Sequence, residues 1–236
     1  MPGFIIHLAE ATIIMEHMEK KTDAVWRQEF MLGNLLPDTR LGKDKVSSHF
    51  WSSEHEDYIA RAPKLEYFLT KYGHRLNEPA ILGYYAHLYL DEHYVDQYWP
   101  QIMKFEDVEG HLEPRRAYIY QVEMRQDGKI IPFGEFFTTE NYYGDYTRSN
   151  QWFVEKYHIQ PPEYKYLENI HMDEVHAEDL KYVLEELNHI CHKGKMGDEK
   201  EMSVFNLREL DDFVQRTAES FYTHVKHIVH MEYKGI

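Results

Sequence analysis

A histidine and an aspartate stand four residues apart in a mainly apolar part of the chain. His87 and Asp91 lie within residues 82–94, where most neighbouring side chains are apolar or aromatic. If this stretch is helical, the two residues share one face, with Cβ atoms about 5–6 Å apart. A buried imidazole and a buried carboxylate need a partner, because an unpaired buried charge is expensive. The pair therefore predicts either a shared divalent metal ion or a His–Asp hydrogen bond inside the core.

Three earlier segments contain further residues of the types that bind metals. His7 lies among the apolar residues 4–11, Asp38 ends the motif GNLLPD, and His49 stands in the motif SHF. Each residue also has a purely structural interpretation: a core histidine, a carboxylate that caps a turn, or an imidazole that stacks on aromatic rings. Together with His87 and Asp91 they supply three imidazoles and two carboxylates, a set that suits zinc.

The order and spacing of these motifs resemble the zinc-dependent phospholipase C family. The resemblance rests on MPGFIIHLAEA, GNLLPD, SHF and LGYYAHLYLDE, which follow one another within residues 1–92. It implies an all-α fold, a compact multi-helix bundle that holds up to three zinc ions and cleaves a phosphodiester. Single-strand nucleases of the same superfamily use a similar zinc cluster.

Carried over to this chain, the resemblance implies a specific set of ligands. Asp38, His49, His87 and Asp91 would form one zinc site, and Asp91 would also reach a second ion held by His7. Asp38 resembles the carboxylate that serves in the family as general base or bridging ligand. It would orient or deprotonate the attacking water, in a pocket lined by aromatic residues such as Trp51, Tyr84 and Tyr85.

The chain departs from the family pattern after Asp91. The third zinc site of the family needs a histidine shortly after this aspartate, followed by an H-x-x-x-E pair. Gln97 stands six residues after Asp91, and no H-x-x-x-E occurs further on. The sequence therefore predicts one or two zinc ions and leaves the third in doubt. Asp96, Asp145 or a C-terminal histidine are the candidates that remain for additional ligands.

Composition limits the classes of function. The 236 residues, of which 43% are hydrophobic, suffice for a single domain that spans residues 1–236 and buries a sizeable core. A formal net charge of −15 argues against a stable nucleic-acid complex, because phosphate contacts need clustered Lys and Arg. A single cysteine, Cys191, excludes an intrachain disulfide and a multi-cysteine zinc finger.

The apolar residues near the N-terminus do not form a targeting signal. This run is short, amphipathic and without a basic segment before it, so we do not interpret it as a signal peptide. No segment approaches the roughly 18 apolar residues of a membrane span. We therefore expect a cytoplasmic protein without a transmembrane segment, and the sequence leaves its oligomeric state open.

Periodicity and punctuation predict a mainly helical chain. Helical patterns cover residues 3–20, 23–35, 63–73, 78–104, 138–157, 176–192 and 207–233, with Pro100 as a candidate break and Asn206 as an N-cap. Residues 117–137 differ, because alternating residues flank the turn signal Asp127-Gly128. We expect a small β-hairpin inserted outside the helical core, either a surface flap or a lid over the site.

These observations lead to one functional expectation and two alternatives. The expectation is a metal-dependent phosphoester hydrolase, phospholipase C-like, in which zinc activates a water that attacks phosphorus. Its partner would be a small phosphoester or a phospholipid head group. The alternatives are a single-strand nuclease of the same superfamily, and a non-catalytic helical module whose metal is structural or absent.

Overall fold

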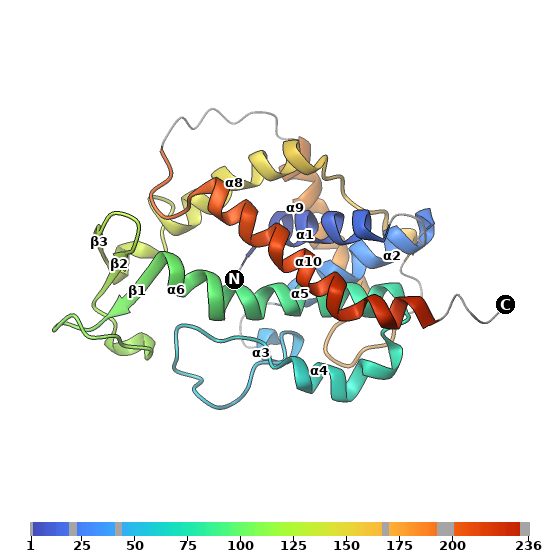
Figure 1. The fold of residues 1–236 in the computed structure, drawn as a ribbon, viewed down its shortest axis with the longest axis horizontal. Helices are drawn as coiled ribbons and strands as arrows, with labels where there is room; N and C mark the ends of the chain where they lie inside the picture. Colours follow the sequence, from blue (N-terminus) through green and yellow to red (C-terminus); the bar gives the residue numbers. More distant parts are fainter. Residues whose placement is uncertain (1, 19–22, 41–43, 167–169, 193–200, 232–236) are drawn as a thin grey trace.

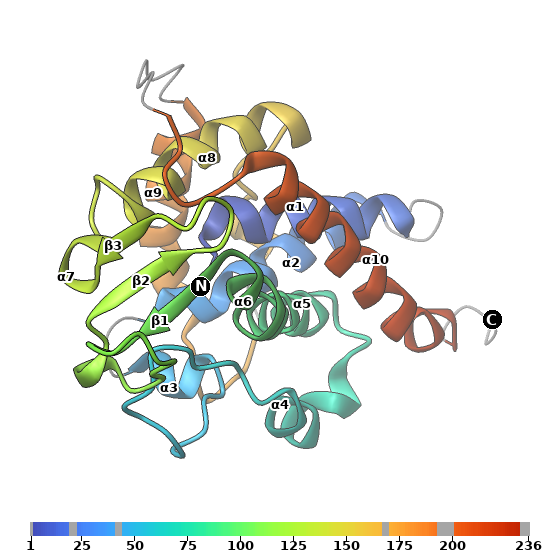
Figure 2. The same cartoon turned by 60° about the vertical axis from the view of Figure 1, so that its left-hand side comes forward.

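The computed structural model describes residues 2–18, 23–40, 44–166, 170–192 and 201–231 (Figure 1). In these residues the protein is a helical bundle with one small antiparallel sheet at one end (Figures 1 and 2). The predicted all-α class with a small β insertion is thus confirmed. No helix in the described ranges has both the length and the apolar character needed to cross a membrane.

Helices occupy each range predicted from periodicity, and two short helices at residues 45–48 and 133–136 lie outside those ranges. The helices are α1 (Phe4–His17), α2 (Ala24–Leu35), α3 (Lys45–Ser48), α4 (Leu65–Tyr72), α5 (Pro79–His93), α6 (Trp99–Ile102), α7 (Phe133–Phe136), α8 (Tyr142–Tyr157), α9 (Leu180–His192) and α10 (Leu207–Met231). Side-chain caps explain two of the starts. Asp23 accepts a hydrogen bond from the Trp26 N–H at 2.9 Å, and Asn206 accepts from the N–H groups of Arg208 and Glu209.

Helices α2 and α5 pack backbone against backbone because each contributes a glycine. A Cβ atom on Gly33 would lie 2.0 Å from the carbonyl oxygen of Ala80, and one on Gly83 would lie 2.0 Å from that of Phe30. Any larger residue would push the helices apart. This close approach brings the end of α2, including Asn34, beside the part of α5 that carries the predicted ligands.

The helical path of α5 continues with a change of geometry. A π-helical turn spans Tyr94–Tyr98, and α6 then runs from Trp99 to Ile102. Pro100 does not break the path, because it lies in the first turn of α6, where its missing N–H costs no hydrogen bond. The helical path predicted for residues 78–104 therefore ends at Ile102, and the next residues form a strand.

The β insertion is larger and more deeply packed than predicted. Strands β1 (Met103–Glu106), β2 (Gln121–Met124) and β3 (Ile130–Pro132) form an antiparallel sheet in the order β1-β2-β3. The predicted hairpin is β2–β3, but its inward side chains Val122, Met124 and Ile131 are buried in the core. The expectation that residues 117–137 lie outside the core is therefore wrong. Alternate strand residues face one side, and here that side meets helices.

The long connection between α3 and α4 is tied to the sheet end of the molecule. The Ile59 N–H donates to the Pro114 carbonyl at 2.8 Å, and the Arg116 N–H donates to the Asp57 carbonyl, also at 2.8 Å. These bonds join residues 57–59 to the segment between β1 and β2. Both segments line the cavity described below, so the backbone bonds fix one of its walls.

Candidate metal centre

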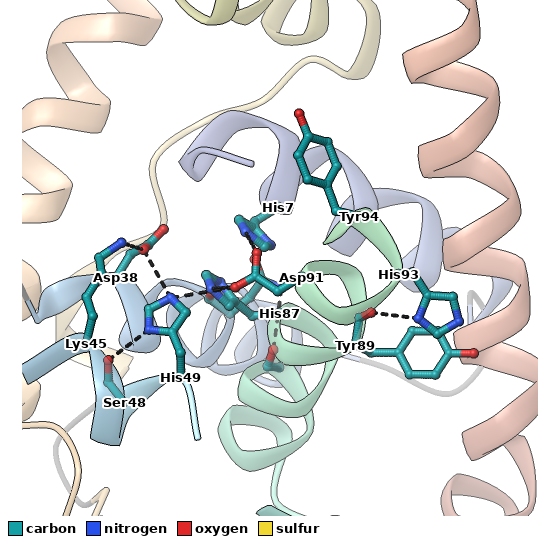
Figure 3. Close-up of polar contacts among 12 residues, drawn as sticks. His7, Asp38, Lys45, Ser48, His49, His87, Tyr89, Asp91, His93 and Tyr94 are labelled. Atoms are coloured by element: carbon teal, nitrogen blue, oxygen red, sulfur yellow. Dashed lines mark hydrogen bonds and ion pairs between the residues drawn. The ribbon is translucent and has the colours of Figure 1, made fainter. Parts of the chain in front are cut away.

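The five residues predicted as ligands meet in one buried cluster (Figure 3). Helix α1 contributes His7, and α5 contributes His87 and Asp91. Asp38 lies in a 3-10 turn, Leu36–Thr39, directly after α2, and His49 follows α3. Asp38 is the most exposed of the five, at only 8%. Segments up to 84 residues apart in the sequence (7 to 91) thus supply one site.

Asp91 lies at the centre of the cluster. Its Oδ1 is 3.4 Å from His7 Nε2, and its Oδ2 is 3.4 Å from His87 Nε2 and 3.6 Å from His49 Nε2. His49 Nε2 also lies 3.5 Å from Asp38 Oδ1. These separations exceed ordinary N–H···O hydrogen bonds. They match the spacing of about 3.3–3.6 Å between ligand atoms that share a tetrahedral zinc ion at about 2.0–2.2 Å.

Hydrogen bonds behind two of the rings determine which nitrogen faces the cluster. His87 Nδ1 donates to the Asn34 carbonyl oxygen at 2.8 Å. The Ser48 hydroxyl donates to the Pro37 carbonyl at 2.9 Å and lies 3.0 Å from His49 Nδ1. Because that hydroxyl has a single proton, it accepts from the Nδ1–H of His49. In its neutral form, each of the two rings therefore presents an unprotonated Nε2, as in metal-binding histidines whose outer nitrogen is held by a neighbour.

Burial favours the neutral form of two of the imidazoles. It lowers the pKa of His7 to about 4, with a further contribution from His87, and it also lowers the pKa of His49. For Asp91, burial raises the pKa, but the interactions with His87 and His7 outweigh it and the net shift is downward. The imidazoles of His7 and His49 are therefore neutral at pH 7, and they face a carboxylate.

The polar atoms at the centre are also unsatisfied. In the described residues, both oxygens of Asp91 and the Nε2 atoms of His7, His49 and His87 are buried without a hydrogen-bond partner. Imidazole nitrogens and carboxylate oxygens thus face one another without donors between them. This arrangement costs free energy unless a cation lies between them. The donor set of imidazole nitrogens and carboxylate oxygens fits zinc.

The geometry divides the ligands between two positions. Asp38, His49 and His87 form one group, and His7, His87 and Asp91 form another. His87 offers one lone pair, because its Nδ1 is bound to Asn34, so it could serve one ion only. With Asp91 Oδ2 close to both His49 and His87, the first position would have four ligands. The second position would retain His7 and Asp91 Oδ1.

The candidates for additional ligands lie elsewhere. Asp96 is exposed, and Asp145 accepts backbone N–H groups from residues 203–205 and pairs with Arg148. His224 Nε2 lies 3.1 Å from the Tyr85 hydroxyl. His227 and His230 have side chains outside the described residues. None of these side chains that the structure describes joins the cluster. In the described residues, these candidates therefore provide no site for a third ion.

Three residues of the site escaped the sequence analysis. Lys45 Nζ lies 2.8 Å from Asp38 Oδ1, and Ser48 holds His49 as described above. Glu10, one turn after His7, is fully buried, and neither carboxylate oxygen has a hydrogen-bond partner among the described residues. Burial, with Asp91 second, raises the pKa of Glu10 well above its usual range. The sequence could have pointed to Glu10, because this glutamate stands within a mainly apolar helical stretch. Nothing in the polar sequence around Lys45 singled out that lysine.

A large cavity leads to one edge of the cluster. Its volume is about 1440 Å³, and Asp38 and Lys45 both line it. Aromatic residues, among them Trp51, Phe137 and Tyr142, line its wall. Arg116 and Phe133, from the β insertion, also line it. The insertion is therefore part of the cavity wall.

Two aromatic residues expected in the pocket are instead part of the core. Tyr84 and Tyr85 are 0% and 1% exposed. The Tyr84 hydroxyl donates to the Ser48 carbonyl, and Tyr85 contacts His224. Of the three aromatic residues predicted to line the pocket, only Trp51 does so. Tyr85 stands two residues before His87 and so faces another side of α5. Tyr84 lies one turn before His87, where its ring packs against Phe50 and Phe68 in the core.

No protein-family model, no curated protein and no solved structure matches this chain. The function is therefore inferred from the geometry and chemistry of the cluster and from the motifs that build it.

Proposed function

We propose that this protein is a zinc-dependent phosphoester hydrolase, with a phosphodiester as its preferred substrate class. One observation carries the proposal: buried imidazole nitrogens and carboxylate oxygens converge at 3.4–3.6 Å, and Asp38 at the edge of this set lines a cavity. The resemblance of the four motifs to zinc-dependent phospholipases C supports the same conclusion.

The residues present divide into those that hold the metal and those that face the substrate. Asp38, His49, His87 and Asp91 would hold one zinc ion, and His7 with Asp91 would contribute to a second. A bound zinc ion supplies positive charge for the phosphoryl oxygens and lowers the pKa of a coordinated water. Asn34 and Ser48 keep two imidazoles in the tautomer that binds metal.

Asp38 is the member of the set with access to both the cluster and the cavity. Burial raises its pKa, but the interaction with His49 and the charge of Lys45 outweigh this, so the pKa lies well below its usual range. A carboxylate with so low a pKa is a weak proton acceptor. We therefore favour a role in binding metal and orienting the nucleophilic water over full proton abstraction.

A single-strand nuclease of the same superfamily is the second candidate. The aromatic residues on the cavity wall favour it, because bases stack on such side chains. The net charge of −15 opposes it, because nucleic-acid backbones are bound by cationic surfaces. Small phosphoesters or phospholipid head groups therefore come first as substrates.

Elemental analysis of protein purified without chelators, paired with hydrolysis of bis-para-nitrophenyl phosphate, tests the proposal. We expect one or two zinc ions per chain and turnover that disappears on chelation and returns with zinc. Stoichiometric zinc without turnover on phosphodiesters, phosphomonoesters or single-stranded DNA would indicate a structural metal site. Protein that neither contains nor takes up zinc would contradict the proposal altogether.

A further inference from the structure

Lys45 places a fixed positive charge beside the proposed metal centre. It begins helix α3, four residues before His49, and its Nζ lies 2.8 Å from Asp38 Oδ1 (Figure 3). Its side chain is 28% exposed. A lysine ammonium paired with a carboxylate is charged at neutral pH.

The same ammonium is accessible from the cavity. Lys45 and Asp38 both line it, whereas the three histidines and Asp91 lie behind them in the core. A lysine ammonium has three N–H donors. The hydrogen bond to Asp38 uses one of them, which leaves donors for a group that enters from the cavity.

The balance of charge indicates what that group is. Asp38 and Asp91 carry two negative charges, which one zinc ion neutralises, and Lys45 then leaves one positive charge at the cavity floor. A phosphodiester carries one negative charge on its two non-bridging oxygens. The site with one zinc ion and Lys45 therefore matches a phosphodiester in charge, without a further metal ion.

We propose that Lys45 is a substrate-binding residue, whose ammonium donates to a non-bridging oxygen of the phosphoryl group while it remains paired with Asp38. It supplies charge that a further metal ion would otherwise supply. This inference rests on the proposed phosphoesterase function and identifies one of the residues that recognise its substrate.

A competing role makes the opposite prediction. If Lys45 only neutralises Asp38 until a metal ion arrives, removing its charge frees Asp38 and increases the affinity for zinc. Phosphate affinity would then stay unchanged. If Lys45 binds the phosphoryl group, removing its charge weakens phosphate binding and leaves the metal content unchanged.

Calorimetric titration of the zinc-loaded protein with inorganic phosphate separates the two roles without depending on turnover. We expect Lys45→Met to weaken phosphate binding by about tenfold or more, the effect of a lost charge-assisted hydrogen bond. Lys45→Arg keeps the charge and should remain within about fivefold of wild type. Lys104→Met is the matched control, because Lys104 pairs with Glu123 at 2.6 Å in the sheet and does not line the cavity.

The outcomes are distinct for the inference and for the function. Wild-type affinity for phosphate in folded, zinc-loaded Lys45→Met overturns the role of Lys45, as does wild-type protein that holds zinc but binds no phosphate. A wild-type protein without zinc instead overturns the proposed function, and the inference with it. If Lys45→Met does not fold, a large loss of phosphate affinity in folded Lys45→Arg with retained zinc also overturns the inference.

Discussion

Helix α5 carries two histidines beside carboxylates, and their surroundings differ. His87 Nε2 faces Asp91 with no hydrogen-bond partner among the described residues, and its other nitrogen is held by the Asn34 carbonyl. His93, near the end of α5, stacks on Tyr89 at 4.1 Å, and its Nδ1 bonds the Tyr89 carbonyl. The Oε2 atom of its neighbour Glu92 lies 3.9 Å from His93 Nδ1, and this glutamate is partly exposed.

The difference shows what makes a metal site. A histidine near a carboxylate on a helix is common and is satisfied by local contacts, as His93 is. At His87 three other segments add His7, His49 and Asp38, so that acceptors outnumber donors. Convergence from several elements, together with burial, is what produces the need for a cation.

The largest expected effect is the loss of bound zinc when both His87 and Asp91, the cluster residues of α5, are replaced. His87→Ala with Asp91→Ala deletes one ligand from the first position and the carboxylate shared with the second. Elemental analysis should show zinc near zero, with activity at background. His93→Ala with Glu92→Ala is the matched pair on the other side, and it should keep zinc at the wild-type level. Equal zinc content in the two double variants would show that the cluster does not bind metal.

Asp38→Asn should reduce activity far more than stability. Asparagine caps a turn about as well as aspartate, so a structural role would tolerate the change. Loss of a ligand that also orients water should lower kcat by about 10²–10⁴-fold. Asp96→Asn changes an exposed carboxylate just beyond α5 and serves as the control. Equal rates of bis-para-nitrophenyl phosphate hydrolysis for Asp38→Asn and wild type would return Asp38 to a turn-capping role.

Ser48→Ala should weaken zinc binding by about 10–100-fold, as the loss of groups behind metal ligands typically does. The variant removes the acceptor that holds the Nδ1–H of His49. Ser220→Ala is the control on the other side of α5, where Ser220 lies 2.8 Å from the Tyr89 hydroxyl. Competition with a chromophoric chelator measures both affinities. A Ser48→Ala affinity as high as that of Ser220→Ala would mean that His49 needs no such support.

The smallest effect concerns stability and compares the two faces of the sheet. Met124 is fully buried, and Met124→Ala should lower the free energy of unfolding by about 2–5 kcal/mol. Ile130 on β3 is 48% exposed, and Ile130→Ala should change it by less than about 0.5 kcal/mol. Urea unfolding measures both. If both substitutions lower the free energy of unfolding by a similar small amount, the hairpin lies outside the core.

Local patterns were sufficient for most of the helices and for the five residues that meet in the buried cluster. The spacing of His87 and Asp91 places them on one helix face whatever surrounds them, because i and i+4 positions are neighbours in any α-helix. Asn206 caps α10 through atoms two and three residues away. The motif order also identified His7, Asp38 and His49, and the structure brings them to the same cluster.

Tertiary structure decided the rest, because it depends on contacts between distant segments. The approach of α2 to α5 at Gly33 and Gly83 puts the Asn34 carbonyl beside His87 and so selects its tautomer. The pairing of Lys45 with Asp38 and the burial of the β2–β3 hairpin likewise depend on the positions of neighbouring elements. Periodicity records which side of an element is apolar, but it does not record which element packs against that side or at what distance.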